Sequence, residues 1–339
     1  MQTEADNMLV SMFSRMLQKE HPVSYARARH SLDDPEHAAM WTQLAEGGWL
    51  DIGNSESGER DGADMLGIGE TLGRNLLTLP FGFCAFVLRP LGEALPELLE
   101  SGTLLPLDAF PAAGRIDTGM DDCPLVDYHG ARVQYYRISP GNAEWDTWII
   151  RRYAGEDLAV VDGLDGCVAL GRLPDAAPAA ESMFALPRQQ MVSLLREALA
   201  LDLAEMLGAA SASLDLAIAY AKERKQFGRL IGQYQAIKHP LANGWVALDN
   251  GRYAVRKLLA EAAAIPGPSG NGIEQTANRL VTAAATQATK LTIQVHGGIG
   301  FAWEHDAHLF LKRVYCLATR TRRLAAMLGC VPGTVAIAA

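Results

Sequence analysis

Two segments of this 339-residue chain place a cation, amide side chains, an aromatic ring and clustered glycines at the ends of long helical patterns. The first is "YAKERKQFGRLIGQYQAI", from Tyr220 to Ile237. It carries Arg224, Gln226 and Phe227 before a Gly-centred break, and Gln235 just after it. A guanidinium binds phosphate oxygens, while amide groups and a ring suit a sugar and a base. This combination predicts an anion site of the nucleotide type.

The second segment is "QVHGGIGF", residues 294–301, in which three glycines occupy four positions. Glycine clusters occur where the chain turns sharply or where a ligand must approach the backbone closely. One interpretation is a helix C-cap followed by a turn. The other is a phosphate pocket in which Gln294 and the amides of Gly297 and Gly298 complete the site begun by Arg224. The octapeptide alone leaves both open.

Four amphipathic stretches must position these residues, at about 189–227, 233–264, 273–296 and 305–329. The breakers between them are "GRLIGQ", "PGPSGNG" and the glycine cluster. Their lengths and short connections predict an antiparallel four-helix bundle. The first and third helices of such a bundle run parallel, so both junctions are expected at the same end.

The rest of the chain has different residue patterns from the four amphipathic stretches. The pattern is helical over about 5–100, and turn signals separate short runs such as "ARVQYYRI", "TWIIRRY" and "DLAVVDG" between 101 and 185. We therefore predict a mainly α fold with a small central β domain. The expected domains are 1–100, 101–185 and 186–330.

Composition narrows the possible function. Hydrophobic residues make up 49% of the chain, charged residues make up 20%, and no uninterrupted apolar run approaches the ~20 residues of a membrane span. From Leu186 onward 17 Lys and Arg face 10 Asp and Glu, a net +7, whereas the remainder is −16. A basic second half suits an anionic ligand, although a solvated basic face produces the same pattern. The cations are dispersed without interleaved aromatic residues, which argues against nucleic-acid binding.

Location and thiol chemistry follow from the N-terminus and the cysteines. The first residues lack the basic start and apolar core of a signal peptide, so a cytoplasmic location without a membrane span is expected. The five cysteines are odd in number and far apart, which indicates buried thiols and neither disulfides nor a redox motif. They are Cys84, Cys123, Cys167, Cys316 and Cys330.

Two further motifs have simpler explanations. "GIGETLG" (Gly67, Gly69, Gly73) lacks the spacing of a dinucleotide fingerprint and is expected to allow close helix packing. "EHDAH" (304–308) could place two imidazoles on one helix face, but no further metal ligands suggest themselves. A solvated helix start is the favoured interpretation, and no metal site is predicted.

The two junction segments resemble the flavin-binding signatures of acyl-CoA dehydrogenases. "AYAKERKQFGRLIGQYQAIKHPLAN" and "QVHGGIGFAWEHDAHLFLKR" are similar to that family's C-terminal helical domain, with the specific similarity covering about 195–315. The resemblance implies a helical domain, a β domain and a four-helix bundle. It also implies an oxidoreductase of lipid metabolism, in which the bundle of one subunit holds the adenosine and pyrophosphate of a neighbour's FAD. The residues that would line this pocket are Arg224, Gln226, Phe227, Gln235, Gln294, Gly297 and Gly298.

The sequence departs from the family at the catalytic positions. The Thr-Glu-Pro and Gly-Ser-Asp segments that wrap the flavin ring are missing from "FPAAGRIDTGMDDCPL". Thr321 stands about where a catalytic glutamate is expected. A second known position of the family's catalytic base is on the first bundle helix, and Glu197 lies within one residue of it. The competing interpretation of Glu197 is a surface carboxylate. Removal of an α proton from a thioester needs such a carboxylate.

These departures predict a non-catalytic or half-site subunit. The chain resembles the shorter subunits of heteromeric acyl-CoA dehydrogenases that act on steroid side chains and assemble as α2β2 tetramers. An acyl-CoA substrate and a second, catalytic subunit follow from that resemblance, with bulky steroid-CoA thioesters as candidates. Two alternatives remain open: a self-sufficient homo-oligomer that uses Glu197 or another unconventional base, and a flavin-free assembly protein.

Overall fold

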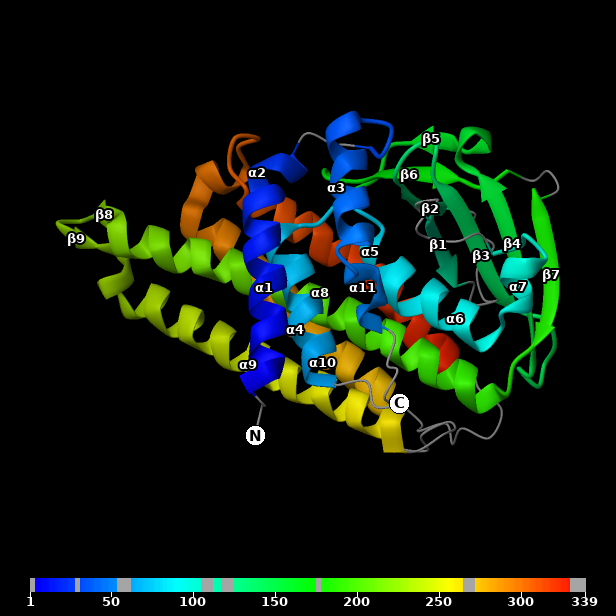
Figure 1. Ribbon diagram of the computed structural model, residues 1–339. Coiled ribbons are helices and arrows are strands. Elements are labelled where there is room, and N and C mark those ends of the chain that lie inside the picture. Colours follow the sequence, from blue (N-terminus) through cyan, green and yellow to red (C-terminus); the bar gives the residue numbers. More distant parts are fainter. Residues whose placement is uncertain are drawn as a thin grey trace.

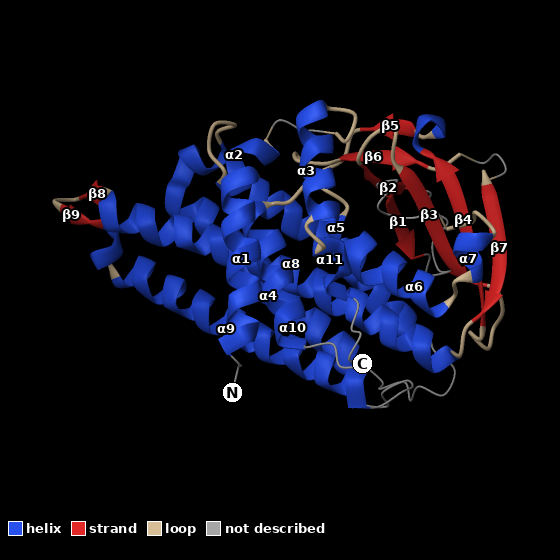
Figure 2. Ribbon diagram, viewed as in Figure 1, coloured by secondary structure: helices blue, strands red, loops and turns tan. Residues whose placement is uncertain are grey.

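Helices form the first and last parts of the described chain and strands form its middle (Figures 1 and 2). The computed structural model describes residues 4–27, 31–53, 62–104, 112–116, 125–174, 178–264 and 272–329. The mainly helical architecture with a small β region agrees with the prediction. The helices before the strands are α1 (Glu4–Glu20), α2 (Val23–Ala26), α3 (Pro35–Glu46), α4 (Gly62–Asn75), α5 (Phe81–Phe83), a π-helical turn (Cys84–Leu88), α6 (Arg89–Ala94) and α7 (Glu97–Glu100).

The strands form two small sheets. In the first sheet the order is β1-β3-β4-β7, with β1 parallel to β3 and the other pairs antiparallel; in the second, antiparallel sheet it is β2-β6-β5. Their bounds are β1 Ala112–Ile116, β2 Leu125–Tyr128, β3 Gln134–Pro140, β4 Thr147–Ala154, β5 Ala159–Val161, β6 Ala169–Arg172 and β7 Ala180–Ala185. Trp148 and Ile150 alternate inward along β4 and are fully buried. The three predicted strands correspond to β3, β4 and β5.

Four long helices follow, namely α8 (Arg188–Glu223), α9 (Gln235–Ala264), α10 (Ile273–His296) and α11 (Ala307–Gly329). α10 contacts α8, α9 and α11, as expected for a bundle. Among the described helices, α8 alone is long and apolar enough to cross a membrane, although the sequence showed no uninterrupted apolar run. Within its apolar window 67% of the residues are buried inside the protein, which is typical of a core helix.

Glycines bring α4 and α8 into close contact. A Cβ atom at Gly73 would lie 1.9 Å from the carbonyl oxygen of Glu205, and one at Gly208 would lie 2.0 Å from that of Glu70. Only glycine permits backbones this close. The prediction that "GIGETLG" serves helix packing is therefore confirmed. Because one buried cluster runs from α1 through the strands to α11, the three-domain division remains a proposal.

The described cysteines are buried or half-buried thiols, and the segment 304–308 contributes to no described group of three potential metal ligands. Cys84 and Cys167 are buried, Cys316 is half-buried, and all three are free thiols, whereas Cys123 and Cys330 lie outside the described residues. Burial raises the pKa of the Cys84 thiol to about 12, so it stays protonated. In the described part of the chain, no three His, Cys, Asp or Glu side chains are grouped as metal ligands would be.

Candidate functional site: the bundle end and the buried arginine network

A tight hairpin closes the end of α8. The helix ends at Glu223, four residues earlier than predicted, because Arg224 leaves the helical conformation (ψ 125°). Two short strands then pair, β8 (Lys225–Gln226) and β9 (Arg229–Leu230). Positive φ at both connecting residues, 51° at Phe227 and 81° at Gly228, is characteristic of a type I′ turn. Gln226 and Phe227 therefore lie on a projecting hairpin beyond the helix (Figure 1).

The hairpin holds an exposed ring in a costly conformation. Phe227 is 93% exposed, and a left-handed backbone costs an L-residue about 1–2 kcal/mol. Tyr234 stabilises the hairpin base, since its hydroxyl donates to the carbonyl of Gln226 at 3.1 Å and its ring lies 3.9 Å from the Arg229 guanidinium carbon. The hairpin thus presents an aromatic ring at its tip that the described residues leave exposed.

At the second junction, between α10 and α11, the backbone of two glycines is exposed to solvent. Gly297 ends α10 with φ 64° and ψ −138°, and its amide bonds to the carbonyls of Gln294 and Ile293. A Cβ atom at Gly298 would meet nothing within 4 Å. Gln294, Gly297 and Gly298 are all exposed. Gly297 therefore serves the helix cap, whereas packing against the described residues does not require glycine at Gly298.

Ring stacking joins the two junctions. The Tyr220 ring in the last turn of α8 lies 4.5 Å from the His296 ring at the end of α10, with 27° between their planes. His296 Nδ1 bonds to the Thr292 carbonyl at 2.8 Å, which fixes that nitrogen as the donor. The ends of α8 and α10 thus meet, as the parallel arrangement predicted, and the exposed Gln235 follows the hairpin as the first residue of α9.

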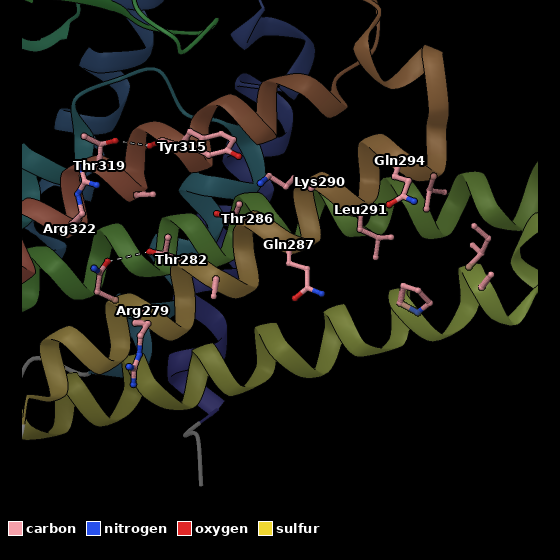
Figure 3. Close-up of a pocket in the computed structure, with 17 residues that line it drawn as sticks. Arg279, Thr282, Thr286, Gln287, Lys290, Leu291, Gln294, Tyr315, Thr319 and Arg322 are labelled. Atoms are coloured by element: carbon pink, nitrogen blue, oxygen red, sulfur yellow. Dashed lines mark hydrogen bonds between the residues drawn. The ribbon is translucent and has the colours of Figure 1, made fainter. Parts of the chain in front are cut away.

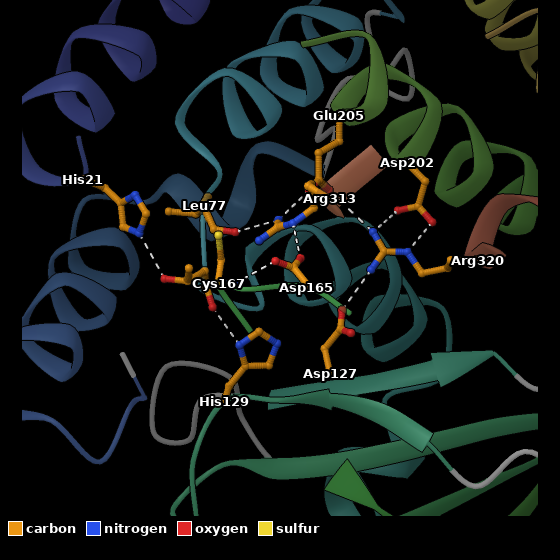
Figure 4. Close-up of polar contacts among 11 residues, drawn as sticks. His21, Leu77, Asp127, His129, Asp165, Cys167, Asp202, Glu205, Arg313 and Arg320 are labelled. Carbon is orange, nitrogen blue, oxygen red and sulfur yellow. Dashed lines mark hydrogen bonds and ion pairs between the residues drawn. The ribbon is translucent and has the colours of Figure 1, made fainter. Parts of the chain in front are cut away.

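A buried arginine lies between α8, α11 and the strands (Figure 4). The Arg313 side chain is only 7% exposed. Its guanidinium binds Asp165 at 2.6 Å, Glu205 at 2.9 Å and the Leu77 carbonyl at 3.1 Å. Paired charges of this kind are tolerated inside a protein because each compensates the desolvation of the other.

A second arginine extends the network two turns along α11. The Arg320 guanidinium donates to both carboxylate oxygens of Asp202 at 2.7 Å. It also lies 3.1 Å from a carboxylate oxygen of Asp127 in β2 and 3.5 Å from one of Glu205. Burial raises the pKa of Asp202 to about 6, against the opposing effect of Arg320. The acids on this face of α8 are therefore paired with guanidinium groups of α11, which offset the cost of burying them.

The predicted base positions lie on the same two helices. Glu197 is half-buried on α8, five residues before Asp202. Thr321 is fully buried, and its hydroxyl lies 3.4 Å from the Ala318 carbonyl. The sequence analysis missed Asp202 and Glu205. One signal was present, because acids three residues apart share one face of a helix, and arginines seven residues apart, such as Arg313 and Arg320, share one face of another. Much of the segment expected to cradle a flavin ring, 105–111 and 117–124, lies outside the described residues.

Comparisons with known proteins agree with this architecture. Residues 188–320 match the family model "Acyl-CoA dehydrogenase, C-terminal domain". The acyl-CoA dehydrogenase IpdE2 of Mycolicibacterium smegmatis is 30% identical over 257 residues, which cover 75% of this chain and 72% of the relative. The bundle, the two sheets and this relative together define the class: the chain belongs to the acyl-CoA dehydrogenase family.

Solved structures share the fold across nearly the whole chain. A variant of the Tcur3481-Tcur3483 steroid ACAD superimposes with a TM-score of 0.71 at 18% identity, covering 96% of this chain and 98% of that one. The ChsE4-ChsE5 complex from Mycobacterium tuberculosis gives 0.68 at 18% identity, covering 95% and 96%. Family membership identifies the chain as related to oxidoreductases that act on acyl-CoA thioesters.

Proposed function

We propose that this chain is a cytoplasmic subunit of a heteromeric FAD-dependent acyl-CoA dehydrogenase and that it supplies the adenosine and pyrophosphate half of an FAD site to a catalytic partner. The observation that carries the proposal is the bundle end, where exposed Arg224 and Phe227 at one junction and the open backbone of Gly298 at the other follow helices whose ends are joined by the Tyr220–His296 stack. An α2β2 assembly acting on steroid-CoA thioesters is the form we favour, because the fold is shared with a steroid ACAD and with a two-component complex.

The residues at the bundle end fit such a group. Arg224 would pair with pyrophosphate, and the ring of Phe227 would pack on adenosine. Gln226, Gln235 and Gln294 offer amide groups for the linked sugar and base. Gly297 and Gly298 leave amides accessible for close approach. When bound, FAD supplies the acceptor for the hydride that leaves the β carbon of the substrate.

The side chains at the expected base positions in this chain are poor candidates for the catalytic base, so we assign the base to the partner. A hydroxyl such as that of Thr321 cannot remove an α proton, and Asp202 and Glu205 are paired with arginines. Glu197 on the half-buried face of α8 keeps the alternative of a self-sufficient homo-oligomer open. A flavin-free assembly protein is the third possibility, in which the bundle end would serve only as a contact surface.

The experiment begins with the complex purified from its native cell. Arg224→Ala should weaken flavin retention by about 2–4 kcal/mol, because a desolvated charge-assisted contact is lost. Lys225→Ala, the exposed neighbouring cation, is the matched control and should retain flavin. The chain expressed alone should be colourless and inactive on saturated acyl-CoA.

Three results would contradict the proposal. A yellow homo-oligomer that reduces an artificial acceptor with acyl-CoA would show that the chain is self-sufficient, and loss of turnover in Glu197→Gln with flavin retained would then identify the base. A native complex without flavin would favour the assembly protein. Equal flavin content in Arg224→Ala and Lys225→Ala would reduce Arg224 to a surface charge.

A further inference from the structure

Arg27, near the N-terminus, contacts the loop that follows the glycine cluster. Its Nη1 donates to the Trp303 carbonyl at 2.7 Å, and its Nη2 pairs with the carboxylate of Asp306. The two side chains of this ion pair are 22% and 31% exposed, so solvent screens their charges only in part. A guanidinium that holds a backbone carbonyl and a carboxylate at once restricts the path of the chain between them.

The backbone that carries Arg27 is itself held in place. Arg27 directly follows α2, in which Ala26 is fully buried. The Tyr25 ring of the same helix stacks on the His37 ring of α3 at 5.5 Å with 17° between the planes, and the Tyr25 hydroxyl lies 3.3 Å from His37 Nδ1. The Arg27 side chain therefore reaches the loop from a fixed position.

The segment 297–306 between α10 and α11 is anchored near both of its ends. At the first end the Gly297 amide caps α10, whose last turn carries Gln294 (Figure 3). At the other end Arg27 holds the chain through the two contacts just described. Residues 298–299 between these anchors are exposed. The path of this open stretch therefore depends on the Arg27 contacts as well as on the helix cap.

A column of three rings connects the same loop to the end of α8. The His305 ring lies 4.4 Å from the His296 ring, which in turn stacks on the Tyr220 ring at 4.5 Å. His305 Nδ1 accepts a hydrogen bond at 3.1 Å from the backbone amide two residues further on. Because Asp306 adjoins His305 in the chain, the contact with Arg27 also restricts the outermost ring of the column.

We infer that Arg27 is a positioning residue of the proposed cofactor site, holding the loop 302–306 so that the two junctions keep the spacing that a pyrophosphate and its adenosine require. The inference rests on the function proposed above and deepens it, because the N-terminal helices as well as the bundle then set the geometry of the cofactor half-site. Arg27 acts through Trp303 and Asp306 and is assigned no contact with the cofactor. Supporting groups of this kind decide how well a site is organised before its ligand arrives.

The test compares Arg27→Ala with a matched control, Arg89→Ala. Arg89 also belongs to the N-terminal helices, its side chain is likewise 22% exposed, and it pairs with the carboxylate of Asp51. In the isolated chain Arg27→Ala should speed hydrogen exchange several-fold at the amides of Ala302 and His305, which are bonded to carbonyls within the loop. Arg89→Ala should leave the exchange of these two amides unchanged.

The same two variants are then compared in the complex purified from the native cell. Arg27→Ala should raise the apparent dissociation constant of FAD about tenfold, because the half-site is less well ordered. Flavin absorbance of the desalted complex measures this change, and Arg89→Ala should match the unmodified complex. Urea unfolding of the isolated chain should show similar stability for both variants, which separates loop order from general destabilisation.

A charge exchange tests the ion pair itself. Arg27→Lys keeps the charge but loses the forked geometry and should retain an intermediate amount of flavin. Arg27→Asp combined with Asp306→Arg re-forms the pair with its signs reversed and should retain more flavin than either single change. Absence of any rescue in the double variant would overturn the assignment to the ion pair.

The outcomes separate this inference from the proposed function. Unchanged exchange at Ala302 and His305 in Arg27→Ala would show that Arg27 does not order the loop. Full flavin retention in Arg27→Ala, with flavin lost in Arg224→Ala, would overturn the positioning role and leave the shared FAD site standing. Full flavin retention in both variants would overturn the proposed function and this inference with it.

Discussion

Adjacent glycines at the end of α10 allow the cap and the cofactor interpretations to be separated. Gly297 has φ 64° and ψ −138°, a region that L-residues avoid, so Gly297→Ala should cost the isolated chain about 1–3 kcal/mol of unfolding free energy. Gly298 does not have positive φ, and its added Cβ would meet nothing within 4 Å. Gly298→Ala should therefore change the stability of the isolated chain by less than about 1 kcal/mol, with a small gain as plausible as a small loss.

In the complex we expect Gly298→Ala to affect flavin binding, although it barely changes the stability of the isolated chain. If the backbone at Gly298 lies against FAD, an added methyl group clashes only when the cofactor is present. Gly298→Ala should then release flavin from the complex while the isolated subunit unfolds normally. Denaturant unfolding of the isolated chain and flavin absorbance of the desalted complex are the two measurements.

The result that refutes this reasoning is specific. Equal destabilisation of isolated and assembled protein by Gly298→Ala, with flavin fully retained, would return residues 297–300 to the status of a turn. Loss of flavin in Gly297→Ala alone would show only that the cap positions the loop. The pair of variants therefore separates backbone strain from ligand clash.

Three further predictions follow from the described contacts. Arg313→Met leaves Asp165 and Glu205 buried without their cation and should destabilise the chain by about 3–5 kcal/mol in urea unfolding; unchanged stability would show that water or another cation replaces it. Phe227→Asn creates the favoured Asn-Gly type I′ turn and should stabilise the hairpin by about 1 kcal/mol, measured as slower amide exchange at β8 and β9, while flavin retention in the complex falls. Burial raises the pKa of Asp202 above its usual 3.8 to about 6. The contribution of Asp202 to the free energy of unfolding is therefore present below pH 4 and is lost as the pH rises through 6. Asp202→Asn should remove this pH dependence from unfolding free energies measured between about pH 4 and 7, and a pH dependence that persists would belong to another group.

The local features of the fold could be predicted from the sequence. Apolar spacing located the four long helices to within a few residues, and the glycines of "GIGETLG" correctly indicated close packing, because each signal depends on neighbours in sequence. The end of α8 was misplaced. The "FG" turn lacks the Asn-Gly signature of a type I′ hairpin, so the helical pattern appeared to continue to Phe227.

The buried network could not be predicted in the same way. Arg313 meets Glu205 across 108 positions and Asp165 across 148. Such partners are chosen by the packing of α8, α11 and the strands, which no local pattern encodes. The bundle-end residues were identified through family signatures, and their cofactor role remains a prediction.

The interior and the bundle end differ in how completely the chain satisfies its own groups. The half-buried Asp202 and the buried Glu205 have arginine partners inside the chain, so their carboxylate oxygens are already hydrogen-bonded. At the bundle end the opposite holds: Phe227 has a left-handed backbone and is 93% exposed, and no described atom lies within 4 Å of a Cβ added at Gly298. A conformation that costs free energy in the isolated chain persists where another molecule compensates for it. A cofactor bound at the two junctions would supply that compensation, so the bundle end is the part of the described chain where we expect a second molecule to bind.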